Sequence, residues 1–178
     1  MNHSTAIFDA LCACLGLNPE SQDAASLIRE AYAEPENGPR LPRNRNVIYW
    51  TVLQDPSADP VCSGQRTEAD GAGRNTTVVY TTLKYQLIIV CYGPACVEHA
   101  VRIRSMLFLD GFGSPRRILR NAGIYPVPDP PQPAILHEEE GSLWRKRADL
   151  TISLRVRHEE TALNQGNIQS PPEVILHK

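Results

Sequence analysis

The chain has 178 residues, with 18 Lys and Arg against 20 Asp and Glu, and a formal net charge of −2. This length suits a single domain over 1–178, and a hydrophobic content of 42% excludes a wholly disordered protein. No stretch approaches the roughly 20 apolar residues of a membrane span, so no membrane partner is expected. The near-neutral charge also argues against a general nucleic-acid binder, which needs a basic excess.

Two short helices and a strand are predicted in the N-terminal third. Apolar residues at helical spacing favour a helix over 4–15, with Ser4 as its cap. Asn18-Pro19 is typical of a helix start, so a second helix is expected over 19–34. A connector rich in Pro, Arg and Asn then leads to a β-branched and aromatic strand at 47–53.

The next two segments predict an arm that leaves the core. Residues 54–75 show no periodicity and many Gly, Asp, Ser and Pro residues, which predicts a projecting loop at the tip of a hairpin. A long strand over 76–92 follows. It begins as polar–apolar alternation and ends in the apolar run 87–91, so it is expected to start exposed and finish buried.

Helices and an extended stretch separate this strand from the last one. Gly93-Pro94 opens an amphipathic helix with a stripe at Cys96, Ala100, Ile103 and Leu107. Ser114-Pro115 begins a short helix that ends at Gly123. Residues 124–133 include five prolines and are expected to be extended.

The clearest strand runs over 143–159. Its apolar residues alternate with a polar set that includes Arg145, Arg147, Arg155 and Arg157. Fifteen such residues would reach roughly 50 Å, which outruns one small core and suggests a strand that extends onto a neighbouring copy. Residues 160–178 are expected to form a C-terminal extension, with a last edge strand at 173–177.

Three groups of polar residues are candidate sites. The arginine stripe suits either phosphates or an acidic partner, or is simply a solvated face. Three consecutive acids, Glu138, Glu139 and Glu140, favour a solvated hairpin tip over a catalytic or magnesium-binding pair. The cluster of Cys91, Cys96 and His99 has no second Cys/His pair, and Cys96 and His99 point to different faces of the helix. No metal, cofactor or catalytic residue is therefore predicted.

The order of several pieces resembles a known family. These pieces are the run 85–95 with Tyr92, Gly93 and Pro94, the helix with Arg104-Ser105, and the Trp144-Arg145-Lys146-Arg147 start of the last strand. Over roughly residues 20–160 the chain resembles the neck and tail-terminator proteins of tailed bacteriophages.

The resemblance implies an α+β domain, with a mostly antiparallel (mixed) sheet, helices packed on one face and long protruding strands. It implies a virion protein, assembled in the host cytoplasm, that forms a closed and usually hexameric ring at the head-proximal end of the tail tube. The expected partners are the tail tube protein, the neck connector or head-completion protein and, in contractile tails, the sheath. Genomic DNA would pass through the lumen without specific binding. The family supplies no catalytic residues.

We therefore interpret the chain as a structural protein that ends tail-tube polymerisation. Strand alternation, independently of the family, suggests the four arginines and the three acids as inter-subunit or tube-facing contacts. Two alternatives stay open: a head-completion or connector ring of the neck, and a hydrolase that uses Cys91, Cys96 and His99.

Overall fold

The computed structural model describes residues 3–31, 44–55, 63–69, 75–109, 111, 113–140 and 143–162, which form four helices and seven strands. The helices are α1 (His3–Leu15), α2 (Gln22–Leu27), α3 (Cys96–Phe108) and α4 (Pro115–Asn121). The strands are β1 (Ile28–Glu30), β2 (Val47–Gln54), β3 (Ser63–Ala69), β4 (Asn75–Tyr92), β5 (Ile124–Pro126), β6 (Ala134–Glu140) and β7 (Leu143–Ala162).

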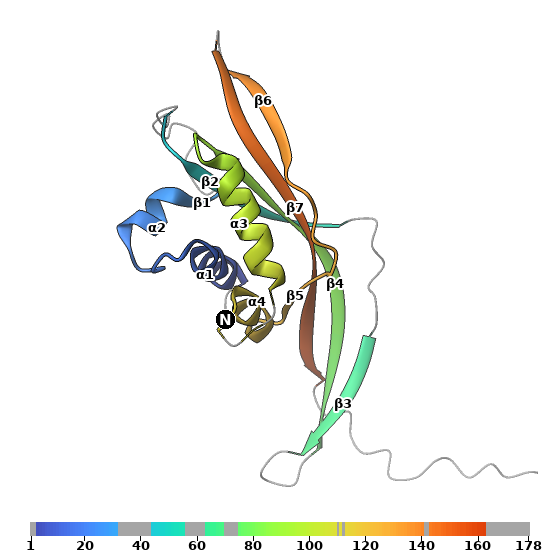
Figure 1. The fold of residues 1–178 in the computed structure, drawn as a ribbon. Helices are drawn as coiled ribbons and strands as arrows, with labels where there is room; N and C mark the ends of the chain where they lie inside the picture. The colour runs from blue at the N-terminus through green and yellow to red at the C-terminus, as the bar shows by residue number, and fades with distance from the viewer. Residues whose placement is uncertain are drawn as a thin grey trace, which may run out of the picture.

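All seven strands belong to one sheet, in the order β1-β2-β4-β7-β5, with β3 beside β4 and β6 beside β7. β1 runs parallel to β2, and the other pairs are antiparallel. Helices α1, α3 and α4 lie on one face of this sheet (Figure 1). The expected α+β class, with helices on one face of a mostly antiparallel sheet, is confirmed.

The core lies between α1, α3 and α4 and the middle of the sheet. The predicted stripe of α3 is buried, and so is every second residue of β7 from Ala148 to Val156. On β4, Leu87 and Ile89 pair with β7 at Ile152 and Leu150, and all four side chains are buried. Alternation along β7 therefore predicted correctly which side chains enter the core.

The second helix, predicted over 19–34, is shorter in the structure: residues 28–30 form a strand, and residues 32–34 lie outside the described part of the chain. Helix α2 begins at its N-cap Ser21, whose Oγ accepts a hydrogen bond from the Ala24 N–H, and ends at Leu27. Ile28 has extended backbone angles and pairs with Ile48 as the first residue of β1. Burial of the β-branched Ile28 beside β2 outweighs the helical spacing of the apolar residues.

Both ends of the β4–β7 ladder reach beyond the helices (Figure 1). At one end β6 and β7 form a hairpin, and at the other β3 pairs with β4. Part of the expected 54–75 loop is thus a strand, because residues 63–69 find ladder partners on β4. Residues 56–62, 70–74 and 163–178, with the strand expected at 173–177, lie outside the described residues.

The proline-rich segment between β5 and β6 is tied to α3 by one arginine. Arg104 Nε donates to the Pro131 carbonyl at 2.7 Å, and Nη2 donates to the Pro130 carbonyl at 3.3 Å. Hydrogen bonds from a charged donor are stronger than neutral ones, so Arg104 fixes where the hairpin leaves the body. Within the described residues, no helix combines the length and apolarity needed to cross a membrane.

Gly93 makes the turn from β4 into α3 possible. Its φ is +102°, and a Cβ there would lie 2.7 Å from the Arg45 carbonyl oxygen. The neighbouring Asn46 Oδ1 accepts the Ala95 N–H at 3.0 Å, at the first turn of α3. Only glycine fits this close approach at this backbone angle.

Gly93→Ala is therefore expected to lower the free energy of unfolding by about 2 kcal/mol or more, through backbone strain and the contact with Arg45. Urea unfolding followed by circular dichroism measures this. Gly111→Ala is the matched control, because a Cβ at Gly111 meets open space, and its change should stay within about 0.5 kcal/mol. Equal losses for the two variants would contradict this role of Gly93.

Candidate interaction surface

The face of the sheet opposite the helices is its least covered part (Figure 1). We call it the open face. It consists of the outward side chains of β2, β4 and β7: Tyr49, Thr51, Lys84, Gln86, Ile88, Val90, Tyr92, Arg145, Arg147, Asp149, Thr151, Ser153, Arg155 and Arg157. These side chains are half-buried or exposed. A mixed apolar and charged sheet face of this kind suits contact with another macromolecule.

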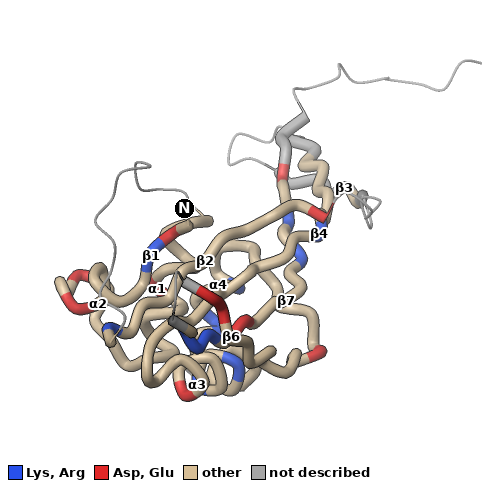
Figure 2. Tube along the Cα trace, turned by 90° about the horizontal axis from the view of Figure 1, so that it is seen from above, with Lys and Arg blue, Asp and Glu red and all other residues tan. Residues whose placement is uncertain are grey.

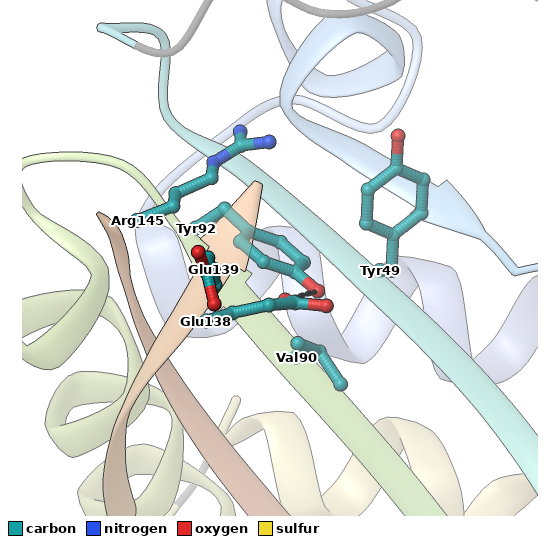
Figure 3. Close-up of a pocket in the computed structure, with 6 residues that line it drawn as sticks. All are labelled: Tyr49, Val90, Tyr92, Glu138, Glu139 and Arg145. Carbon is teal, nitrogen blue, oxygen red and sulfur yellow. Dashed lines mark hydrogen bonds between the residues drawn. The ribbon is translucent and has the colours of Figure 1, made fainter. Parts of the chain in front are cut away.

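A cleft of about 350 Å³ lies at the edge of this face, where the β6–β7 hairpin begins. Figure 3 shows the six residues that line it: Tyr49, Val90, Tyr92, Glu138, Glu139 and Arg145. They come from β2, β4 and both strands of the β6–β7 hairpin. Seen from above, acidic residues of β6 lie beside basic residues of β7 (Figure 2).

Tyr92 contacts both strands of the hairpin at this cleft. Its hydroxyl donates to Glu138 Oε2 at 3.0 Å, and the Arg145 guanidinium lies 4.5 Å from the centre of its ring. Arg147 Nη1 also donates to Glu138 Oε2, at 3.1 Å, and its Nη2 pairs with Asp149 at 2.9 Å. The base of the hairpin is therefore held by cross-strand charge pairs and a cation–π contact.

These contacts shift two pKa values in opposite directions. The hydrogen bond from Tyr92, followed by that from Arg147, lowers the pKa of Glu138, because both favour the carboxylate. Burial raises the pKa of Tyr92, and its hydrogen bond to Glu138 adds to the effect. Glu138 therefore stays ionised and Tyr92 stays protonated near neutral pH.

A second cluster stiffens the other end of the ladder. The Arg157 guanidinium lies 4.3 Å from the centre of the Tyr80 ring, and Arg157 Nε is 2.8 Å from Glu159 Oε1. The Tyr80 ring covers Gly64 on β3, where a Cβ would overlap it. This stack of an aromatic ring over a strand glycine keeps the three-stranded arm together.

In the described part of the chain, two cations in the middle of the open face, Lys84 and Arg155, lack the ion pairs that Arg147 and Arg157 form. Lys84 and Arg155 are directly opposite each other in the β4–β7 ladder, and neither forms an ion pair with an acid of the described residues. Directly opposed like charges destabilise a sheet. Tyr125, 40% exposed, is the ladder neighbour of Arg155 on its other side.

The residues predicted as contacts thus fall into separate groups. Arg145, Arg147 and Glu138 meet at the cleft, Arg157 belongs to the arm, and Arg155 lies between them. Glu140 pairs with Leu143 through its backbone, and its side chain lies outside the described part. Sequence reasoning missed Tyr49 and Lys84, because only the ladder register places them beside these residues.

The remaining residues quoted for the family resemblance are dispersed. Gly93 shapes the turn into α3, followed by the exposed Pro94, and Arg104 holds the proline-rich segment. Ser105 is exposed on α3, and Trp144 is 69% exposed on the hairpin. The exposure of Trp144 is the strongest sign of an interface among them, since tryptophan dominates interface energetics.

The cysteines do not assemble a reactive site. Cys12, Cys14, Cys91 and Cys96 are buried free thiols. Burial raises the pKa of Cys91 to about 12, and burial lowers the pKa of His99, so neither ionises readily. Among the described residues, no three Cys, His, Asp or Glu side chains group as a metal site.

Comparison with protein-family models gives a match over nearly the whole chain. The family model described as phage neck terminator protein matches residues 5–177. A search of curated proteins finds no match.

The pKa of Glu138 leads to a pH prediction. Because that pKa is lowered on folding, the ionised carboxylate contributes stability above its unfolded pKa, and this contribution is lost as the pH falls through the folded value. Wild-type protein should therefore lose more free energy of unfolding between about pH 6 and about pH 3 than Glu138→Gln does. Glu139→Gln is the matched control: its carboxylate forms no ion pair or hydrogen bond with the described residues, so the variant should follow wild type. Parallel curves for wild type and Glu138→Gln would rule out this role.

Burial of the thiols predicts slow chemical modification. In the folded protein at about pH 8, Cys12, Cys14, Cys91 and Cys96 should react with a disulfide reagent about 100-fold more slowly than in urea. Site-resolved mass spectrometry measures each rate. Fast labelling of Cys91 or Cys96 in the folded state would instead favour the hydrolase alternative.

Proposed function

Since the chain belongs to the phage neck terminator protein family, we propose that it forms a closed ring, most simply a hexamer, on the head-proximal end of the tail tube. There it ends tube polymerisation and joins the tail to the neck connector. In a contractile tail the same ring would also meet the sheath. The function rests on contacts between proteins, with no bond made or broken.

The observation that carries this proposal is the reach of the β4–β7 ladder beyond the helices at both ends. A head-to-tail ring needs two different complementary patches on each copy and a rotation that closes. The hairpin presents exposed Ile135, Leu136 and Trp144 at one end, and the β3–β4–β7 arm extends from the other. Strand extensions of this kind supply such patches without enlarging the core.

The charge of the chain supports the same role. A channel for the genome must let DNA slide, and a formal net charge of −2 avoids the counterion-release affinity of a basic binder. Arg147 beside the cleft and Arg157 of the arm are neutralised within the chain, Arg147 by Glu138 and Asp149 and Arg157 by Glu159. They therefore offer little free positive charge to phosphates.

The test uses the full-length protein and tail tubes assembled from the tube protein of the same phage. Mass photometry and negative-stain microscopy should show a ring, and the ring should cap one end of each tube. Adding the protein during assembly should stop elongation at that end.

Two outcomes would contradict the proposal. In the first, the protein stays monomeric at tens of micromolar and tubes elongate unchanged. In the second, rings bind purified heads or connectors and ignore tubes, which would assign the chain to head completion.

A further inference from the structure

We infer that the end of the β6–β7 hairpin of one copy docks on the Lys84–Arg155 pair of the next copy. Glu139 would meet the two cations, and Trp144 would pack against Tyr125. This inference rests on the proposed ring and specifies which surfaces form its repeated contact.

The first support is the like-charge pair itself. Lys84 and Arg155 face each other across the ladder, on the open sheet face. Asp55 follows β2 and its N–H donates to the Lys84 carbonyl, but no ion pair joins an acid of the described residues to either cation. The other open-face arginines with recorded ion pairs, Arg147 and Arg157, have acids within 3.1 Å. An anion from another molecule would remove the repulsion between Lys84 and Arg155.

The second support is the composition of the hairpin. Glu139 and Trp144 are directly opposed in the β6–β7 ladder, so an acid and a 69% exposed indole share one surface. On the body, Arg155 and Tyr125 are likewise directly opposed. Each patch thus combines charged side chains with one exposed aromatic ring. Glu139 is opposite in sign to the two cations of the body, although Lys146 shares its face of the hairpin.

The third support is geometric. Trp144 and Arg155 are separated by eleven residues of one strand, about 36 Å, so the two patches cannot meet within a copy. Even-numbered β7 residues lie on the helix side and odd-numbered ones on the open face, which places Trp144 and Arg155 on opposite sides of the sheet. Patches on opposite sides build a head-to-tail chain of copies, as a ring requires.

A charge-swap experiment on the full-length protein tests the contact. Glu139→Arg and Arg155→Glu should each raise the protein concentration needed for half-maximal ring formation about tenfold or more, measured by mass photometry. Combining the two substitutions should restore it to within about threefold of wild type, because the opposite charges meet again. Trp144→Ala should weaken assembly about tenfold, with unchanged circular dichroism.

Two controls separate a specific contact from net charge. Asp129→Lys adds the same charge as Glu139→Arg at an exposed site away from the hairpin, and should assemble like wild type. Lys146→Glu removes the same charge as Arg155→Glu but makes the hairpin more acidic, and should not lose assembly.

The failure modes are distinguishable. Rings that tolerate both single swaps, or a double swap no better than the worse single variant, would overturn this contact while the proposed ring stands. Intact rings of Arg155→Glu that lose retention on duplex DNA would overturn it as well, and assign the cations to the genome. A wild-type protein that forms no ring would overturn the proposed function and this contact together.

Discussion

The antiparallel ladder between β4 and β7 determines the shape of this protein. It runs without interruption from the Thr77–Ala162 pair to the Tyr92–Arg147 pair, far beyond the helices that cover its middle. Every other strand pairs directly with it or through β2. A ladder this long can be satisfied by its own backbone hydrogen bonds while its ends remain outside the core. The β4–β7 ladder therefore both stabilises the fold and extends beyond the core.

The side chains along the ladder divide these two tasks. On the helix side, residues such as Leu87, Ile89 and Leu150 are buried and supply hydrophobic stabilisation. On the open face, a hydrogen bond from Tyr92 to Glu138 holds the hairpin end, and a cation–π contact of Arg157 with Tyr80 holds the arm. Such contacts let each end keep its shape without a second layer of helices, which leaves the surface available to a partner.

Most of the correct predictions of the fold came from strand alternation, helical spacing and the residues at turns. The faces of β7, the stripe of α3 and the Ser114-Pro115 start of α4 all follow local rules of spacing and capping. The predictions that failed concern segments whose structure depends on strands remote in sequence. Ile28 is a strand because β2 lies beside it, and residues 63–69 are a strand because β4 does. The cleft could not be predicted either, because only the ladder register brings Tyr49 to it. The same holds for the Lys84–Arg155 pair.

The central claim is that both ends of the β4–β7 ladder make contacts with other molecules in the assembled tail. Hydrogen–deuterium exchange of the free protein and of the protein in purified tails tests this directly. We expect backbone amides of β6 and of the β3–β4 arm to become at least about tenfold slower to exchange on assembly, with little change in α1 and α3. Unchanged exchange at both ends, with new protection confined to the helices, would contradict the account.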